Sequence, residues 1–415
     1  MRFLHVSDLH LGKTVGGVPL LEADQPWWAD RFLELVDETR PRAVLIAGDV
    51  YDRSAPSGPA VSLLSRLLTG LAERGVEVLL VPGNHDSAER LSFAREVLAR
   101  QRIHIAGALT RELTRVRLED EHGPVDFWLM PYVFPALVAG ALGDETIRDY
   151  DTAVRRLLVS QPLDPAARNV LVAHQYVTAG GAQPELGGSE SAIGGVGEID
   201  YTAFDAFDYV ALGHIHAACS VGRDAVRYAG TPLCCHFNET RQAPKGPLLV
   251  QLGEKGAPPV IVRRLLPPLH PMREARGDFE TLRETELARR TRGEYLRYAI
   301  TDQPMTPEIS AFFHSLAAQR GSVVMECVSE FRRFTTAGAG PDAEAAREKP
   351  IEALFADFFA ERCGGEQPDE ADAALLHEAA ELLRNAPEDE PGRVAPDPAQ
   401  TDALLRFLLR QEGEA

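Results

Sequence analysis

The sequence predicts an α/β sandwich with a mixed sheet. In residues 2–232, short apolar runs of strand length alternate with segments of helical periodicity. Two segments of alternating polarity, at 113–118 and 125–130, are typical of a hairpin, which brings antiparallel pairing into the fold. Most of the apolar runs end in residues that can bind a metal ion or a phosphate. The sequence therefore predicts a layered α/β domain with a functional site at one edge of its sheet.

Five short, largely apolar runs form the predicted central strands, as is typical of buried strands. They cover residues 2–6, 43–47, 76–80, 169–173 and 209–212. Apolar residues recur at helical spacing in residues 27–39, 61–74, 88–100 and 149–158. Pro41 ends the first of these helices, and Gly75 stands at the usual C-cap position of the second. Residues 103–105 form a further short strand, residues 54–58 and 178–197 form loops, and residues 226–232 close this region.

The chain changes character near residues 267–271, a proline-rich stretch that we interpret as a linker. Beyond it, residues 294–300 and 322–328 alternate like strands and residues 308–319 have helical spacing, which predicts a small α+β unit. Residues 335–341 are rich in glycine and alanine and indicate a flexible linker. Residues 350–362 predict a strongly apolar amphipathic helix, with polar, proline-rich stretches at 364–370 and 385–399 after it.

The net charge of −19 at pH 7 argues at first against a nucleic-acid partner, but its distribution weakens that argument. Residues 340–415 hold 7 Lys and Arg against 19 Asp and Glu, so the rest of the chain holds 36 against 43. Several of the remaining acids are candidate metal ligands, whose charge bound cations would offset. An acidic chain can also bind DNA through a local basic patch or through a partner. The charge therefore leaves DNA binding open.

The cysteines and the start of the chain indicate a reducing, cytoplasmic setting. The cysteines are odd in number and lack any C-x-x-C spacing, which argues against a disulfide framework and against a zinc–thiolate site. They are Cys219, Cys234, Cys235, Cys327 and Cys363. Polar residues interrupt the first eight positions before an apolar core develops, so no signal peptide is predicted. No apolar run approaches the length of a membrane span.

Polar residues that can bind a metal ion follow each of the predicted central strands. The densest group is Gly83-Asn84-His85-Asp86, where Pro82 and Gly83 stop the strand at 76–80 and the chain turns tightly. The other strand ends carry Asp8, His10, Asp49, His174, His214 and His216. If the strands share one sheet, these ends converge at one edge, where the ligand sites of open α/β sheets lie.

These residues form a mixed set of nitrogen and oxygen donors, which suits Mn²⁺, Zn²⁺ or Fe²⁺ better than Ca²⁺. The donors are too many for one ion, whereas two ions that share one carboxylate would use them all. Two ions about 3.5–4 Å apart can orient a water, lower its pKa and bind the attacking and leaving oxygens of a phosphoryl centre. A single histidine, by contrast, is usually structural or on the surface. We apply that interpretation to His5, His104, His122, His270, His314 and His377.

Taken together, these motifs resemble the calcineurin-like metallophosphoesterase superfamily. The resemblance rests on residues 8–10, 48–52 (Gly-Asp-Val-Tyr-Asp), 83–86 (Gly-Asn-His-Asp), His174 and 213–216 (Gly-His-Ile-His). Within that superfamily, residues 10–13, 52–56 and 228–232 are similar to the SbcD family of bacterial DNA nucleases, as is the Leu-Phe-x-x-Phe pattern in residues 350–359. The match covers residues 1 to about 360. It implies a four-layer α/β/β/α sandwich with a small α+β capping domain and a C-terminal helical extension.

The resemblance also implies a role for each strand-end residue. Asp8, His10 and His216 would hold one metal ion, Asn84, His174 and His214 would hold the other, and Asp49 would bridge them. The ions implied are two Mn²⁺, with Mg²⁺ as an alternative.

The residues beside the expected ligands receive narrower roles from the same resemblance. His85 would contact the scissile phosphate or protonate the leaving oxygen. Asp86 would hold the His85 ring from behind, although capping the helix that starts near residue 88 is an equal alternative. Asp52 stands where archaeal relatives carry a histidine. It is a candidate carboxylate behind the ligands, with a turn-stabilising role as the alternative.

The domains implied are a metallophosphoesterase nuclease domain at 1–268, a DNA-capping domain at 269–336, and a flexible linker with a helical ATPase-binding extension at 337–415. In the capping domain, Arg332 and Arg333 are candidates for contact with DNA phosphates, or form an ordinary solvated basic pair. In the extension, four apolar residues are candidates for binding the SbcC ATPase, with packing inside the chain as the alternative. They are Leu354, Phe355, Phe358 and Phe359.

The family also dimerises through helices of its first domain, inside a heterotetramer with the ATPase. Trp27, Trp28 and Phe32, or the helix at 61–71, are candidates for that surface, and burial in the chain's own core is the alternative. The activity implied is Mn²⁺-dependent hydrolysis of DNA phosphodiesters, as double-strand exonuclease and single-strand or hairpin endonuclease, in DNA end processing, repair and recombination. Two other functions stay open: hydrolysis of small phosphodiesters, and a non-catalytic scaffold of the ATPase complex.

Overall fold

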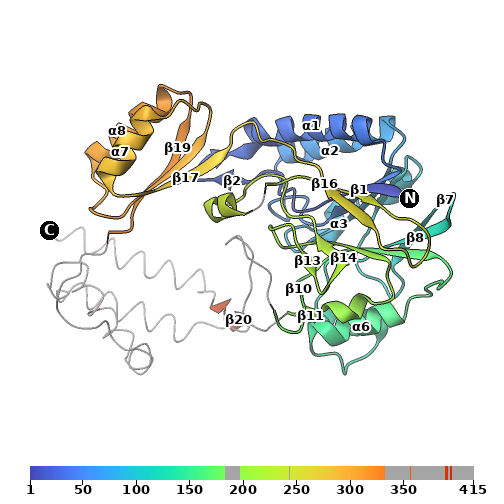
Figure 1. The fold of residues 1–415 in the computed structure, drawn as a ribbon. Helices are drawn as coiled ribbons and strands as arrows, with labels where there is room; N and C mark the ends of the chain where they lie inside the picture. The colour runs from blue at the N-terminus through green and yellow to red at the C-terminus, as the bar shows by residue number, and fades with distance from the viewer. Residues whose placement is uncertain (183–196, 243, 332–355, 357–387, 391–392, 395–415) are drawn as a thin grey trace. The chain divides into compact units, whose positions relative to one another are not determined.

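The computed structural model describes residues 1–182, 197–242, 244–331, 356, 388–390 and 393–394. Its first sheet has the strand order β16-β15-β1-β4-β5-β6 (Figure 1). Those strands are β16 (Val260–Arg263), β15 (Leu248–Gln251), β1 (Arg2–Val6), β4 (Ala43–Ala47), β5 (Glu77–Val81) and β6 (Ile103–Ile105). The strands β1, β4, β5 and β6 are parallel, while β15 and β16 are antiparallel to their neighbours. The sheet is therefore mixed, as predicted.

A second six-stranded sheet has the order β13-β14-β12-β9-β8-β7. Its strands are β13 (Ser220–Val221), β14 (Arg223–Tyr228), β12 (Tyr209–Gly213), β9 (Arg168–His174), β8 (Gly123–Leu129) and β7 (Thr114–Asp120). The predicted hairpin is confirmed as β7 and β8, which pair antiparallel from Thr114–Leu129 to Asp120–Gly123. The predicted central strands thus divide between two sheets and do not share one.

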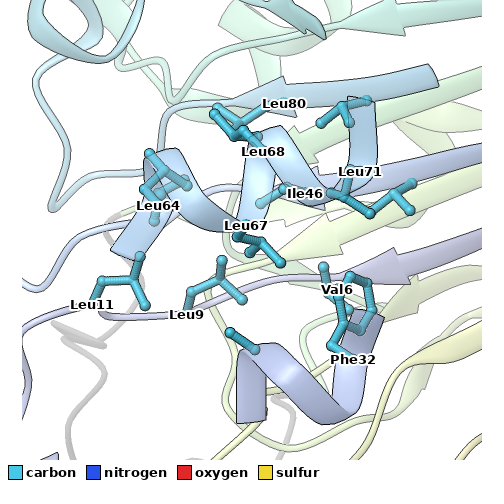
Figure 2. Packing of buried hydrophobic residues seen from close by; sticks show 14 of the residues in the cluster. Val6, Leu9, Leu11, Phe32, Ile46, Leu64, Leu67, Leu68, Leu71 and Leu80 are labelled. Carbon is cyan, nitrogen blue, oxygen red and sulfur yellow. The ribbon is translucent and has the colours of Figure 1, made fainter. Parts of the chain in front are cut away.

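Three hydrophobic clusters show how the layers stack. Alternate side chains of the first sheet point to opposite faces, so Phe3 and Leu45 pack against the second sheet while Leu4 and Ile46 pack under helices. Those helices are α1 (Asp24–Thr39) and α2 (Gly58–Glu73). Figure 2 shows the leucines of α2 packed together with Val6, Ile46 and Leu80 of the first sheet. Both faces of these strands are buried, which is why they read as largely apolar runs.

The outer face of the second sheet carries its own cluster with α5 (Pro135–Leu142) and α6 (Tyr150–Val159). The order of layers is therefore helix, sheet, sheet, helix. Short elements complete this part of the chain. They are β2 (Thr14–Val15), β3 (Val18–Pro19), η1 (Leu20–Glu22), α3 (Ala88–Leu91), α4 (Arg95–Ala99), β10 (Val177–Thr178), β11 (Ile199–Asp200), η2 (Tyr201–Phe204) and η3 (Phe237–Arg241).

Three of the predicted helices differ from the structure in extent. The helix predicted over 27–39 begins at Asp24. The helix predicted from residue 61 begins at Gly58, because the Ser57 hydroxyl accepts a hydrogen bond from the backbone N–H of Ala60 and so caps it. The single helix predicted over 88–100 is wrong. Ala94 adopts the left-handed conformation, with φ of 56°, which divides the segment into α3 and α4.

Residues 272–329 form a three-stranded unit with a core of its own. Its strands β17 (Met272–Gly277), β18 (Tyr295–Ile300) and β19 (Val323–Ser329) are parallel, and α7 (Phe279–Ala288) and α8 (Pro307–Ala318) connect them. Tyr298 and Phe313 stack at the centre of that core, with ring centroids 4.0 Å apart. The strands and helix predicted at 294–328 are confirmed. The prediction missed β17 and α7.

The three-stranded unit is joined to the first sandwich helix through a buried carboxylate. Asp24, at the start of α1, accepts hydrogen bonds from the backbone N–H of His270 at 3.1 Å and from the Tyr295 hydroxyl at 2.7 Å. Beside it, a small apolar cluster contains Val15 of β2 and Met325 of β19. The unit therefore packs against the hairpin that follows His10.

The chain divides into compact units at Met1–Arg332 and Arg333–Ala415. In the second unit the structure describes residue 356 and the antiparallel pair β20 (Glu388–Glu390) and β21 (Arg393–Val394). The predicted domain boundary at 268/269 falls inside the first unit, between β16 and β17, and the predicted division into three domains stays a prediction. None of the described helices has the length and apolar character needed to cross a membrane. Cys234, Cys235 and Cys327 are free thiols, and Cys363 lies outside the described residues.

Candidate metal centre

The carboxyl ends of strands from both sheets meet at one edge of the sandwich. From the first sheet, Asp8 and His10 follow β1, Asp49 follows β4 and Asn84 follows β5. From the second sheet, His174 is the last residue of β9, while His214 and His216 follow β12. A hydrogen bond joins the two sets, because the backbone N–H of His214 donates to Asp8 Oδ1 at 3.0 Å. Packing of two sheets face to face, and not one continuous sheet, therefore assembles the site.

The backbone is strained at four of these positions. Asp8, His10, Asp49 and His214 have φ of 53°, 42°, 46° and 107°, a region that residues with a side chain rarely adopt. Hydrogen bonds between strand ends hold this conformation, including Asp8 N–H to Gly48 O at 3.0 Å and His10 N–H to Asp49 O at 2.9 Å. Conformational strain of this kind persists where the surrounding structure over-determines it, and it is concentrated at functional sites.

The first group of donors contains Asp8, His10 and His216, whose ligand atoms all lie within 4.8 Å of one another. The Nε2 atoms of His10 and His216 are 3.2 Å apart and buried. The Nδ1 atom of His10 has no hydrogen-bond partner among the described residues. Two buried imidazoles that face each other beside a carboxylate are a donor set that a divalent cation satisfies.

The second group is built around the Asn84 side chain. Asn84 Oδ1 lies 3.0 Å from His174 Nε2 and 3.1 Å from His214 Nδ1. The Nδ1 atom of His174 donates to the Ala47 carbonyl oxygen at 2.9 Å, so in the neutral ring Nε2 is an acceptor that faces the site. Asp49 lies between the two groups, because its Oδ2 is 3.4 Å from His174 Nε2 and 3.7 Å from His10 Nε2. This is the place that a bridging carboxylate requires, and its bridging role stays a prediction.

The charges of the site favour a cation. Burial alone would lower the pKa of His174, but Asp49 and Asp8 more than offset that effect and raise it to about 9. Burial raises the pKa of Asp8 to about 6, against the opposing effect of His174 and His216. Carboxylates that hold a proton on a buried imidazole create a negative potential, which equally favours a metal cation in place of that proton. The donors present are those that Mn²⁺, Zn²⁺ and Fe²⁺ accept. The residues therefore fit a pair of divalent ions.

Like His214, which is half-buried, His85 is accessible at the site. Its side chain is 36% exposed, whereas those of His10, His174 and His216 are at most 4% exposed. Its Nδ1 lies 3.0 Å from the Asp52 carbonyl oxygen and therefore donates to it. Its Nε2 lies 3.9 Å from Asp49 Oδ2. An imidazole at the rim of the site, with one nitrogen held by the backbone, can reach a bound substrate with the other.

The structure contradicts both interpretations of Asp86. Its carboxylate accepts hydrogen bonds from the backbone N–H groups of Val50, Tyr51 and Gly83, at 3.0, 2.9 and 2.9 Å. It therefore neither holds the His85 ring nor caps α3, which Ser87 caps. With one oxygen shared by two donors, Asp86 fastens the loop after β4 to the turn after β5. The backbone carbonyl of Asp52, and not the Asp86 side chain, holds the His85 ring.

Asp52 lies behind the site, in an ion pair with Lys13 at 3.0 Å. Its Oδ1 is also 3.9 Å from His10 Nδ1, too far for a direct hydrogen bond. The pair links the segment after β1 to the segment after β4. Because the Asp52 carbonyl binds His85, fixing this residue also fixes the His85 ring. The ion pair with Lys13 is in keeping with the turn-stabilising interpretation of Asp52, while its role as a carboxylate behind the ligands stays a prediction.

The sequence analysis missed Glu239, which is 1% exposed and lies in η3. Its carboxylate accepts a hydrogen bond from His216 Nδ1 at 2.9 Å and pairs with Lys245 at 2.8 Å. An isolated glutamate in an irregular segment carries no periodicity and no motif. The nearest sequence motif is the segment at 228–232, whose Thr231 donates a hydrogen bond to Glu239.

Several predicted contacts cannot be placed. Arg332, Arg333, Leu354, Phe355, Phe358 and Phe359 lie outside the residues whose side chains the structure describes. The dimer-surface interpretation is wrong for Trp28 and Phe32, which are 3% and 0% exposed in the core under α1 and stack on each other. Trp27 is 38% exposed and stays a candidate. His5 is structural, as expected: its two ring nitrogens contact the Tyr209 hydroxyl and the Leu212 carbonyl.

Comparison with known proteins gives a family and a number of similar solved structures, among them the two below. The sequence pattern of the calcineurin-like phosphoesterase family matches residues 1–218. The structure is similar to that of the protein TT1561 of Thermus thermophilus, at 12% identity and a TM-score of 0.33, over 55% of this chain and 89% of that one. It is also similar to a dimetal phosphatase from Danio rerio, at 12% identity and a TM-score of 0.34, over 63% and 98% of the two chains.

Proposed function

The chain belongs to the calcineurin-like phosphoesterase family, and on that premise we propose that it hydrolyses phosphodiester bonds of DNA with two bound metal ions. The observation that carries the proposal is the set of seven donor residues at one edge of the sandwich, with the half-exposed His85 beside them. In this proposal Asp8, His10 and His216 hold one ion, Asn84, His174 and His214 the other, and Asp49 bridges them. The ions are two Mn²⁺, with Mg²⁺ as the alternative.

When bound, such ions lower the pKa of a water and stabilise negative charge on a phosphoryl centre. The chain's own residues orient the site. The Ala47 carbonyl and the Glu239 carboxylate set the tautomers of His174 and His216, so that Nε2 of each faces the ions. The Asp52 carbonyl holds His85 through Nδ1, which leaves its Nε2 to contact the scissile phosphate or to protonate the leaving oxygen.

The proposal of DNA as substrate rests on features outside the metal centre. The segments at 10–13, 52–56 and 228–232 are similar to those of the SbcD nucleases, and the first of them contains Lys13, which supports the His85 position. The three-stranded unit packs against the hairpin that follows His10, and we assign it the role of a DNA-capping domain, residues 269–336. Arg332 and Arg333 at its end would contact phosphates.

We further propose that this protein is the nuclease subunit of an SbcC–SbcD type of complex. The nuclease domain would comprise residues 1–268, and the chain would form a homodimer within a heterotetramer. Residues 337–415 would bind the SbcC ATPase through the apolar helix with Leu354, Phe355, Phe358 and Phe359. The support for this partner is the sequence pattern of residues 350–359 alone.

One assay separates a DNA nuclease from a phosphatase of small esters. The protein is incubated with Mn²⁺ and double-stranded DNA, hairpin DNA or a small chromogenic phosphodiester, with and without added SbcC ATPase. We expect cleavage of both DNA forms, its loss after chelation, and a change of rate when the ATPase is added. Activity confined to the small ester and indifferent to the ATPase would refute the nuclease assignment. Inactivity on all substrates, with metals bound, would favour a scaffold.

A further inference from the structure

A buried hydrogen-bond network that involves four segments of the chain surrounds His216. The mechanism above uses only one of its contacts, the hydrogen bond between His216 and Glu239. The Glu239 carboxylate is its centre. Glu239 Oε1 accepts from His216 Nδ1, while Oε2 accepts from the Thr231 hydroxyl at 3.0 Å, the Cys235 N–H at 3.2 Å and Lys245 Nζ at 2.8 Å. Every one of these donors points at a carboxylate whose side chain is 0% exposed.

Lys245 ties the same network to the backbone of the His216 loop. Its Nζ donates to the His216 carbonyl oxygen at 3.1 Å and also to the Thr231 hydroxyl. The backbone N–H of Thr231 donates to the same carbonyl at 3.1 Å. The ring and the main chain of His216 are thus both held by one cluster. The Lys245 side chain is 12% exposed, so its charge compensates that of Glu239 in a largely dry environment.

The chemistry of this arrangement is specific to His216. A carboxylate can only accept the hydrogen bond from Nδ1, so His216 carries its proton there and presents Nε2 to His10, 3.2 Å away. Among the described residues, the other three histidines of the metal centre have no carboxylate this close to the nitrogen that faces away from the ions: His174 uses a backbone carbonyl. A carboxylate behind a ligating imidazole raises its basicity and fixes its orientation.

We propose that Glu239 is a positioning residue that sets the affinity of only one of the two ions, the one held by Asp8, His10 and His216, and that Lys245 is its obligatory counter-charge. This inference rests on the two-metal site of the proposed function and not on DNA as the substrate. The other ion would be held by Asn84, His174 and His214, none of which is among the hydrogen-bond partners described for Glu239 and Lys245. The two ions therefore differ in how strongly they depend on this network.

The test measures metal binding directly. Mn²⁺ is titrated into the metal-free full chain by calorimetry, and two binding events are resolved for the wild type. Glu239→Ala is expected to weaken one event by about 10- to 100-fold and to leave the other within about threefold. Glu286→Gln is the matched control, because Glu286 is equally buried and ion-paired, but with Arg273 in the three-stranded unit. It is expected to bind both ions as the wild type does.

A second variant covers the case in which Glu239→Ala leaves Lys245 unpaired and fails to fold. In Glu239→Gln with Lys245→Met, both charges are removed and the volume is nearly kept. This pair is expected to fold and to weaken the same single event by at least about tenfold. Wild-type affinity at both events in either folded variant would overturn the proposal, and so would equal weakening of both events.

A spectroscopic measurement shows whether Glu239 orients the His216 ring or only stabilises the fold around it. In the metal-free protein with ¹⁵N-labelled histidine, the His216 ring is expected to show the Nδ1-protonated tautomer. Glu239→Ala is expected to lose that signature and to leave the ring signals of His174 unchanged. An unchanged His216 tautomer would overturn the proposal. These outcomes are independent of substrate: a protein that binds two ions as expected but cleaves no DNA would refute the proposed function and leave this inference standing.

Discussion

At the scale of single residues, the site separates residues that would hold metal from the one that would meet substrate. Five of the seven expected ligands are buried at strand ends, whereas His214 is half-buried and Asn84 is exposed. Neighbouring residues hold the outward ring nitrogens of His174 and His216. His85 is at the rim and is fastened only through Nδ1 by the Asp52 carbonyl. A mutation of His85 should therefore strongly reduce catalysis without removing the metal ions, whereas a mutation of a ligand should weaken metal binding.

His85→Ala is predicted to lower the rate of phosphodiester cleavage by about 10²- to 10⁴-fold, the range for loss of a general acid or base. Both metal ions should stay bound, because His85 is not one of the seven expected ligands: its Nδ1 binds the Asp52 carbonyl and its Nε2 lies 3.9 Å from Asp49 Oδ2. Cleavage is measured at saturating Mn²⁺, and bound metal by elemental analysis. His122→Ala, in the turn between β7 and β8, is the matched control and should be fully active. Loss of a metal ion in His85→Ala would contradict this division of roles.

At the scale of elements, close approach of strand ends from the two sheets decides whether the donors meet. Gly213 ends β12 where the second sheet touches β4 of the first. A Cβ atom there would lie 1.8 Å from the Ala47 carbonyl oxygen and 2.8 Å from His174 Nδ1. Only glycine fits, because that carbonyl is also the acceptor that orients His174.

Gly213→Ala is predicted to lower the free energy of unfolding by about 1–3 kcal/mol, as overpacking of a dense interior does. It should also weaken metal binding, because β4 and β12 must separate. Denaturant unfolding and Mn²⁺ titration measure the two effects. Gly140→Ala, at an exposed position of α5 with no atom within 4 Å of the added Cβ, should instead stabilise the protein by about 0.5–1 kcal/mol. If Gly213→Ala is as stable as the wild type, β4 and β12 can separate at little cost in free energy, and the prediction is wrong.

A second link between elements is the pair of Asp120, at the end of β7, and Arg168, at the start of β9. Arg168 is 1% exposed and donates to Asp120 and to the Gly253 carbonyl at 2.9 Å. Burial alone would raise the pKa of Asp120, but the Arg168 guanidinium and the Met1 amino group together more than offset this and hold the pKa well below its usual value. The carboxylate therefore stabilises the fold above the pKa of the unfolded chain, about 3.9.

Asp120→Asn is predicted to cost about 3–5 kcal/mol at pH 7, because it leaves a buried guanidinium without its counter-charge. The difference from wild type should shrink as the pH falls below about 4, where the unfolded carboxyl takes up a proton and the wild type loses the same stabilisation. Urea unfolding from pH 3 to 7 measures it. Asp30→Asn, which breaks an exposed pair with Arg66, should change stability by less than about 1 kcal/mol at every pH. A loss independent of pH would refute the electrostatic explanation.

At the scale of the whole molecule, the three-stranded unit has its own core and joins the sandwich through few contacts. Asp24 is central to that joint, because it is 2% exposed and accepts hydrogen bonds from both His270 and Tyr295. The ring of Tyr295 also lies on that of His270, with centroids 4.7 Å apart. If this unit caps DNA, its placement should matter for long substrates and not for small ones.

Tyr295→Phe is predicted to lower the rate of double-stranded DNA cleavage several-fold while hydrolysis of a small phosphodiester is unchanged. Its stability should fall by about 1.5–3 kcal/mol, the contribution of a hydrogen bond to a charged group. Tyr298→Phe is the matched control. It removes a buried hydroxyl that contacts Glu286 at 3.0 Å inside the unit, so it should lose similar stability but keep the ratio of the two rates. Equal loss on both substrates would refute a capping role for the unit.

The central strands and the donor residues that follow them could be predicted from the sequence. Burial of both faces gives each strand a largely apolar run, and the donors form short motifs directly after these runs. The hairpin of β7 and β8 and the elements at 294–328 could be predicted as well. That the donors come from two different sheets could be seen only in the tertiary structure. The tertiary structure also decided that Asp86 binds backbone N–H groups while a carbonyl holds His85, and that Glu239 lies behind His216. Hydrogen bonds between residues distant in sequence leave no periodicity, so their partners are set only when the layers pack.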